Sequence, residues 1–164
     1  MLLKILVLHG YKAIKGDNSK NEPDMIVISP AFDWKYVLSI QVKTKEKGEE
    51  ETKKSVSQTL ADSGVLERQF KDYEIFPVLI TQKERFDGKA IEVAKNKVTL
   101  LKTTVFSELM VKTLENIIQW EGLSTKNRSS FLDNLISPFE LKDIFRPKPD
   151  PITKKQSIEK LFEN

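Results

Sequence analysis

The order of the apolar segments constrains the fold most strongly, because strand-like and helix-like patterns alternate along the chain. Two runs, 25–28 and 35–43, are rich in β-branched and aromatic residues and flank a Pro-containing bend, which predicts two strands of a hairpin. Two further apolar runs, 75–81 and 98–103, each follow a segment with helical spacing. A hairpin followed by strands that alternate with helices predicts an α/β fold with a mixed central sheet.

Helices are expected at both ends of this pattern. The apolar residues of 1–10 share one helical face, and Gly10 suits the C-terminal end of a helix. Ser107 can N-cap a last helix that runs to Trp120. The segment 44–54 mixes Lys and Glu without an apolar anchor, which predicts an exposed, mobile loop. The other expected elements are a strand at 11–15 and helices at 55–70 and 88–97.

The chain of 164 residues has the length of one ordinary domain. We place the folded core at 1–122, because the composition beyond Gly122 changes to Ser, Asn and Lys, and several prolines follow within 146–151. We therefore expect 123–164 to be a polar, Pro-containing appendage with short helices around 131–136 and 157–162.

Composition excludes several kinds of site. The sequence has no Cys and a single His, His9, so thiolate zinc sites and multi-His metal sites are excluded. The 27 Lys and Arg against 24 Asp and Glu leave a net charge of +3, too small to argue for nucleic-acid binding by itself. The apolar start is far shorter than the roughly 20 residues that span a bilayer. The lack of Cys fits a reducing compartment, so we expect a cytoplasmic protein without a membrane partner.

The chemistry-bearing residues gather at one end of the expected hairpin. Asp24 precedes the strand 25–28, whereas Gln41 and Lys43 close the next strand. The start of one hairpin strand lies beside the end of its partner, so Asp24 should meet this end, and alternation places Gln41 and Lys43 on one face. An acid, an amide and an amine suit metal-assisted phosphodiester hydrolysis, with Asp24, Gln41 and the Val42 carbonyl as oxygen ligands.

At these residues the chain resembles the PD-(D/E)XK nuclease superfamily. Pro23-Asp24 matches the first half of the signature and Gln41-Val42-Lys43 the second, with Gln where Asp or Glu is usual. The Q-x-K form is similar to that of Mrr-like restriction nucleases. The order of elements is similar to that of the catalytic domains of type IIS restriction enzymes and archaeal Holliday junction resolvases. The resemblance covers about residues 1–120.

The resemblance implies a restriction-endonuclease-like three-layer fold, in which helices flank a central mixed sheet. It implies that Asp24, Gln41 and Lys43 are catalytic, that Mg²⁺ is the cofactor, for which Mn²⁺ can substitute, and that double-stranded DNA is the substrate. Gln58 sits where several of these families carry a helix Gln near the active site. A restriction-type cleavage domain of this kind is expected to work as a homodimer or with a separate recognition domain or subunit.

The chain departs from the superfamily pattern in two respects. Gln41 removes one negative charge from the metal site. Asp24 must then supply the negative charge that attracts the cation, with Glu22 as a supporting acid. Many relatives also carry an acid on the first helix, and 1–10 has none. Four lysines are candidates for tracking the DNA backbone, although the interleaved glutamates make a solvated loop an equal alternative: Lys45, Lys47, Lys53 and Lys54.

Other interpretations of the same residues remain open. Pro23-Asp24 alone also fits a turn, and Gln41 and Lys43 also fit solvent-exposed strand positions. The leading hypothesis is a Mg²⁺-dependent DNA endonuclease. Its rival is a catalytically inactive relative that uses the same fold to bind DNA or a protein, because Gln41 replaces the commoner acid. A third hypothesis is an assembly scaffold that uses the last helix and the C-terminal segment.

Overall fold

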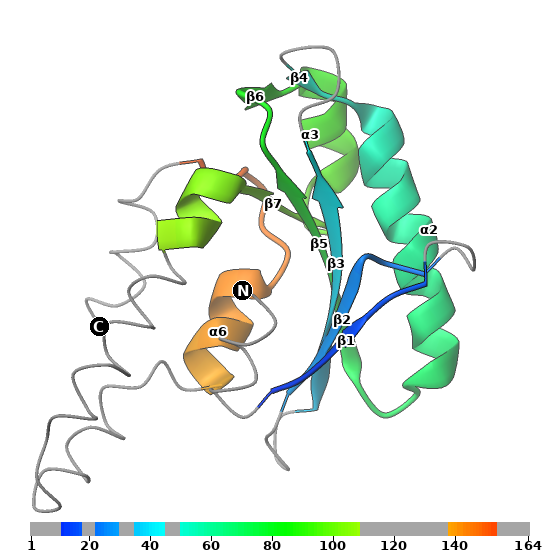
Figure 1. Cartoon of the computed structure of the whole chain (residues 1–164). Helices are drawn as coiled ribbons and strands as arrows, with labels where there is room; N and C mark the ends of the chain where they lie inside the picture. Colours follow the sequence, from blue (N-terminus) through cyan, green and yellow to red (C-terminus); the bar gives the residue numbers. More distant parts are fainter. Residues whose placement is uncertain (1–10, 18–21, 30–34, 45–49, 109–137, 154–164) are drawn as a thin grey trace, which may run out of the picture.

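The computed structural model describes residues 11–17, 22–29, 35–44, 50–108 and 138–153, which contain a five-stranded mixed sheet (Figure 1). The strand order is β1-β2-β3-β5-β7. The first three strands form an antiparallel meander, and β3, β5 and β7 are parallel. This confirms the expected α/β class with a hairpin and a mixed sheet. The strands are β1 (Lys12–Lys15), β2 (Met25–Ile28), β3 (Tyr36–Lys43), β5 (Glu74–Thr81) and β7 (Thr99–Lys102).

Helices cover both faces of the sheet, as Figure 1 shows. The helices α2 (Lys53–Gln69) and α3 (Gly88–Ala94) lie on one face and provide the crossovers between the parallel strands. The helix α6 (Pro138–Phe145) and the helical residues 103–108 lie on the other.

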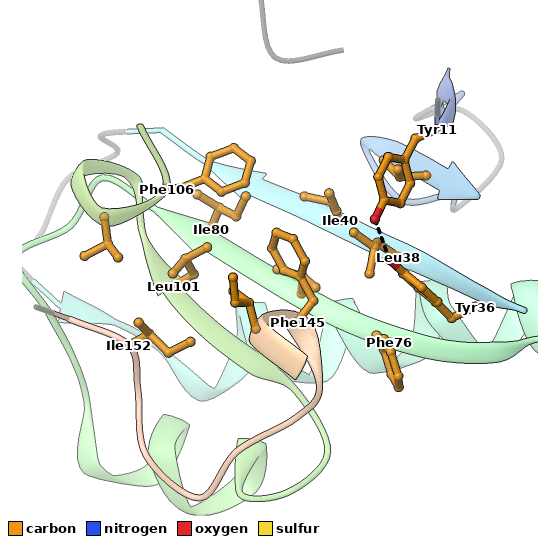
Figure 2. Close-up of a cluster of buried hydrophobic side chains, with 14 residues drawn as sticks. Tyr11, Tyr36, Leu38, Ile40, Phe76, Ile80, Leu101, Phe106, Phe145 and Ile152 are labelled. Carbon is orange, nitrogen blue, oxygen red and sulfur yellow. Dashed lines mark hydrogen bonds between the residues drawn. The ribbon is translucent and has the colours of Figure 1, made fainter. Parts of the chain in front are cut away.

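The alternation of side chains along β3 divides it between two environments. Tyr36, Leu38 and Ile40 enter a large apolar cluster on the α6 side, which Figure 2 shows. Tyr11 joins this cluster, and its hydroxyl lies 2.6 Å from that of Tyr36. The alternate residues of β3 face α2, and toward the end of the strand they are polar. The central strand therefore anchors the core with one face and carries polar groups on the other.

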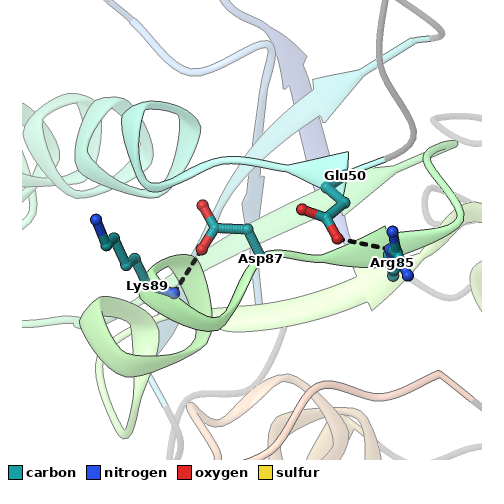
Figure 3. Close-up of polar contacts among 4 residues, drawn as sticks. All are labelled: Glu50, Arg85, Asp87 and Lys89. Carbon is teal, nitrogen blue, oxygen red and sulfur yellow. Dashed lines mark hydrogen bonds and ion pairs between the residues drawn. The ribbon is translucent and has the colours of Figure 1, made fainter.

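A second, two-stranded sheet fixes the start of α2. The strands β4 (Glu50–Glu51) and β6 (Arg85–Phe86) are parallel. Arg85 pairs with Glu50 at 2.6 Å, and Asp87 caps α3 through the Lys89 amide at 2.5 Å (Figure 3). The ion pair joins β4 to β6 across the small sheet, whereas the Asp87 cap is local to the start of α3.

The expectation of an exposed loop at 44–54 is wrong for Glu51, whose residue surface is 1% exposed. Its Oε2 accepts a hydrogen bond from Thr81 Oγ1 at 2.8 Å, and its Oε1 accepts one from Ser55 Oγ at 2.5 Å. These partners compensate the carboxylate for the loss of water. Residues 45–49 lie outside the described part of the chain.

The C-terminal residues 138–153 pack into the core, although the polar composition of 123–164 predicts an appendage. Ile144 and Phe145 of α6 are buried in the same cluster as β3, and Ile152 forms a parallel bridge with Leu101 of β7. Thr99 Oγ1 donates to the Phe145 carbonyl at 2.7 Å. Residues 138–153 thus belong to the main core and not to a separate appendage. Ile144, Phe145 and Ile152 supply the apolar contacts to the sheet.

Ser107 does not cap a helix, because the chain is already helical from residue 103. The early start buries Val105 and Phe106 in the core directly after β7. The expected helix at 1–10 with His9, the part of the last helix beyond 108, and the short helices at 131–136 and 157–162 lie outside the described residues.

Candidate active site at the end of the β2–β3 hairpin

Asp24 lies against the end of β3. The last pair of the β2–β3 ladder joins Met25 to Ile40, so Asp24 falls one step further, opposite Gln41. The Val42 amide donates a hydrogen bond to Asp24 Oδ2 at 2.7 Å. The hairpin therefore brings together the acid and the Gln41–Lys43 end that the sequence placed side by side.

The turn before β2 holds the backbone of Asp24 in place. The Gly16 amide donates to the Asp24 carbonyl at 3.0 Å. A Cβ atom on Gly16 would lie 1.7 Å from the Pro23 carbonyl oxygen, so any other residue at position 16 would push Pro23 and Asp24 away. The Glu22 side chain accepts from the Asp17 amide at 3.0 Å, which assigns it to this turn. Among the described residues, no hydrogen bond or ion pair joins Glu22 to the end of β3.

Lys43 reaches from the end of β3 to α2. Its Nζ donates to Gln58 Oε1 at 2.9 Å, so Gln58 restricts the position of the ammonium group. A second bridge joins the same two elements further back, where Ser63 Oγ donates to Ser39 Oγ at 2.7 Å. These two bridges hold the polar side of β3 against one face of α2.

Gln41 lies between the two bridges on this face of β3. Its surface is only 6% exposed, so it is not the solvated strand residue that one interpretation of the sequence allowed. Within the described residues its Oε1 atom is buried and has no hydrogen-bond partner. Buried polar atoms are nearly always paired, because a buried acceptor without a donor costs about 1–3 kcal/mol. An unpaired oxygen beside Asp24 is the kind of atom that a ligand can satisfy.

A second carboxylate, Asp62, lies on the face of α2 that covers Gln41. It is 5% exposed and sits one helical turn after Gln58 and next to Ser63, the two residues that bridge to β3. Burial raises the pKa of Asp62; the Lys43 ammonium lowers it, and the Asp24 carboxylate raises it further. Asp62 is therefore in electrostatic contact with both charged groups of the hairpin end.

The sequence analysis did not single out Asp62, although a signal was present. The buried positions of α2 are Val56, Thr59, Asp62, Ser63 and Leu66. A carboxylate on the core-facing stripe of a helix is costly unless a charge or ligand compensates it, and such a position indicates function. The stripe can be found by extending the spacing of Val56 and Leu66 through the helix.

The oxygen atoms at the hairpin end fit a hard divalent cation. Asp24 keeps one carboxylate oxygen beyond its bond to Val42, and Gln41 offers its unpaired Oε1. The N–H and C=O of a strand residue face the same neighbour, so the Val42 carbonyl points toward Asp24, whereas the Lys43 carbonyl faces β5 and accepts from Gln82. The described residues hold no group of three or more His, Cys, Asp or Glu that suits a metal. Mg²⁺ commonly uses only one or two protein carboxylates beside neutral oxygens and water.

The candidate DNA-backbone lysines have different positions. Lys53 and Lys54 are exposed in the first turn of α2, and Lys54 lines a pocket beside Lys43. Lys83, which the sequence analysis did not consider, lines the same pocket from the segment after β5. Lys45 and Lys47 lie outside the described residues.

Comparisons with protein-family models, curated proteins and solved structures find no match for this chain. In the part of the chain that the structure describes, no helix has the length and apolarity needed to cross a membrane. The geometry of the hairpin end is thus the basis for a functional assignment.

Proposed function

We propose that this chain is a Mg²⁺-dependent DNA endonuclease of the PD-(D/E)XK kind, the cleavage domain or subunit of a restriction-type enzyme. One observation carries the proposal: the hairpin end places the Asp24 carboxylate, the unpaired buried oxygen of Gln41 and the Lys43 ammonium together against α2. Two of these groups are suited to hold a hard cation, and the third is suited to act on water or phosphate.

Each residue has a distinct part in the proposed reaction. Asp24, Gln41 and the Val42 carbonyl hold Mg²⁺, which when bound supplies Lewis-acid stabilisation of the phosphate oxygens. Lys43 orients the attacking water or the phosphate through its ammonium group, which Gln58 positions. Asp62 is a second carboxyl group that interacts electrostatically with Lys43 and Asp24.

The arrangement of the elements supports the same proposal. A β1–β2–β3 meander, a crossover helix and the parallel strands β5 and β7, with helices on both faces, are compatible with a restriction-endonuclease-like three-layer fold. The two halves of the motif, Pro23-Asp24 and Gln41-Val42-Lys43, lie at the hairpin end that a nuclease of this fold would use as its active site.

The partner of the proposed enzyme is double-stranded DNA. One site cuts one strand, and duplex strands run antiparallel, so a double-strand break requires a two-fold partner or a second subunit. A separate recognition domain or subunit would supply sequence specificity.

The proposal is tested by incubating supercoiled plasmid with the purified chain in Mg²⁺, Mn²⁺ or EDTA. We expect nicking in either metal and none in EDTA. Asp24→Ala and Lys43→Ala should each abolish nicking while circular dichroism and the unfolding midpoint show a folded domain, because neither side chain fills the apolar core. Nicking by folded Asp24→Ala at the wild-type rate would reject the assignment.

The alternative function is an inactive module of the same fold that binds DNA or a protein. The amide at position 41 favours it, because an amide oxygen binds Mg²⁺ less strongly than a carboxylate. Metal-independent binding without any nicking by the wild-type chain would select this alternative.

A further inference from the structure

A pocket of about 300 Å³ opens beside Lys43 at the start of α2. Its lining includes Lys43 and Gln58, the buried Glu51, Ser55 in the first turn of α2, and two further lysines, Lys54 and Lys83. These residues come from the end of β3, from β4 and the start of α2, and from the segment after β5. The pocket is therefore a product of the fold and continues the proposed active site away from Asp24.

The charge of the pocket suits an anion. Three lysines face one carboxylate, Glu51, and both oxygens of that carboxylate already accept hydrogen bonds, from Ser55 Oγ and from Thr81 Oγ1. Within the described part of the chain, no ion pair occupies the ammonium group of Lys54 or Lys83. Among the described residues, the lining thus carries three ammonium groups and one carboxylate.

The framework around these lysines is held in place. Glu51 ties the end of β4 to Thr81 at the end of β5 and to Ser55 on α2, and Thr81 lies opposite Lys43 in the β3–β5 register. The Lys83 amide donates to Thr81 Oγ1 at 3.2 Å. A buried acid at the centre therefore sets the positions of the segments that carry Lys43, Lys54 and Lys83.

The start of α2 adds to the preference for an anion. The first turn contains no acidic residue, and the N-cap Thr52 makes no side-chain capping bond. The N-terminus of a 17-residue helix carries partial positive charge, which favours phosphate.

We propose that this pocket binds a phosphate group of the nucleic-acid strand, next to the phosphate that is cleaved at Asp24 and Lys43. This inference rests on the proposed function; it assigns Lys54, already a candidate for the DNA backbone, to one defined phosphate and adds Lys83 as a substrate-binding residue. Lys43 lies between the two positions and would contact the strand at the junction. The phosphate is either an internal phosphodiester of a continuing strand or a terminal 5′-phosphate.

The test measures DNA binding without cleavage. Fluorescence anisotropy in EDTA compares two duplexes of one sequence, with and without a 5′-phosphate, over a range of KCl concentrations. The pocket variant is Lys54→Ala/Lys83→Ala. The matched control is Lys95→Ala/Lys97→Ala, which removes the same charge at two exposed positions outside the pocket lining.

Loss of one phosphate contact should reduce the slope of log affinity against log salt by about 1 in the pocket variant and leave it unchanged in the control. A reduction with both duplexes identifies an internal phosphate, and a reduction only with the 5′-phosphorylated duplex identifies a terminal one. Equal slopes in the two double variants, or no DNA binding by the wild-type chain, would overturn the inference. Failure of the nuclease proposal is recognised separately, because it appears as an absence of Mg²⁺-dependent nicking while the salt slope still responds to the pocket lysines.

Discussion

Replacing Gln41 by Met should stabilise the protein while it removes the proposed activity. Gln41 is almost fully buried, and its Oε1 has no partner among the described residues. Met has a similar length and no strong hydrogen-bonding atom, so Gln41→Met keeps the packing of the side chain and removes the unpaired acceptor. The variant therefore separates the effect of the amide on the stability of the fold from its role in the proposed activity.

The expected magnitude follows from the burial of that one atom. A buried acceptor without a donor costs about 1–3 kcal/mol, so the free energy of unfolding should rise by about that amount in Gln41→Met. For a chain of this size, each kcal/mol corresponds to a rise of roughly 2–4 °C in Tm. An amide retained at such a cost would be one that serves a ligand.

The assay is urea unfolding at neutral pH in EDTA, followed by circular dichroism. Gln69→Met is the matched control, since Gln69 is exposed at the end of α2 and its replacement should stay within about 0.5 kcal/mol of the wild type. Destabilisation by Gln41→Met would refute the reasoning, because it would show that the amide is satisfied in the folded protein.

Three further outcomes are expected. Gln41→Glu should lower the Mg²⁺ concentration for half-maximal nicking and widen the gap between the Tm values with and without Mg²⁺, because it adds a carboxylate beside Asp24; an unchanged metal dependence would show that Gln41 does not face the ion. Ile144→Ala should lower the free energy of unfolding by about 2–5 kcal/mol, as measured by urea unfolding, since Ile144 is buried in the core of the sheet; a change within about 0.5 kcal/mol would mean that α6 does not pack there. Burial raises the pKa of Tyr36 from 10.0 to about 12, so an unfolded chain ionises first and stability should fall as the pH rises through this window; urea midpoints that stay constant across it would contradict the burial of Tyr36.

The strands and the hairpin end could be predicted from sequence because their signals are local. The β-branched run ending at Lys43 and the Asp before Met25 define a hairpin, and antiparallel geometry then places Asp24 beside Gln41. No knowledge of distant contacts was needed for this step. The predicted neighbours at the hairpin end are accordingly the ones that the structure brings together.

The parts that sequence reasoning missed depend on partners far along the chain. Glu51 is buried, and one of the hydrogen bonds that compensate its burial comes from Thr81, thirty residues later. Asp62 gains its environment from Lys43 and Asp24 on other elements. Glu51 has no local signal of its burial, whereas the helical spacing of Val56 and Leu66 does place Asp62 on the buried stripe.

The packing of the C-terminal segment also depends on distant partners, in this case apolar ones. Ile144, Phe145 and Ile152 lie in a polar, Pro-containing stretch whose composition indicates an appendage. They pack against β3 and β7, whose open face cannot be inferred from the segment itself. A few well-placed apolar residues are enough to add such a segment to the core.

Paramagnetic relaxation by Mn²⁺ tests most directly whether the hairpin end holds a divalent cation. In NMR spectra of the ¹⁵N-labelled chain, sub-stoichiometric Mn²⁺ should broaden the amide signals of Val42 and Lys43 first, and leave that of Ala94 on α3 sharp. Excess Mg²⁺ should reverse the broadening, and Asp24→Ala should abolish it. Broadening that is scattered over the surface, or that persists at Val42 in folded Asp24→Ala, would contradict the account.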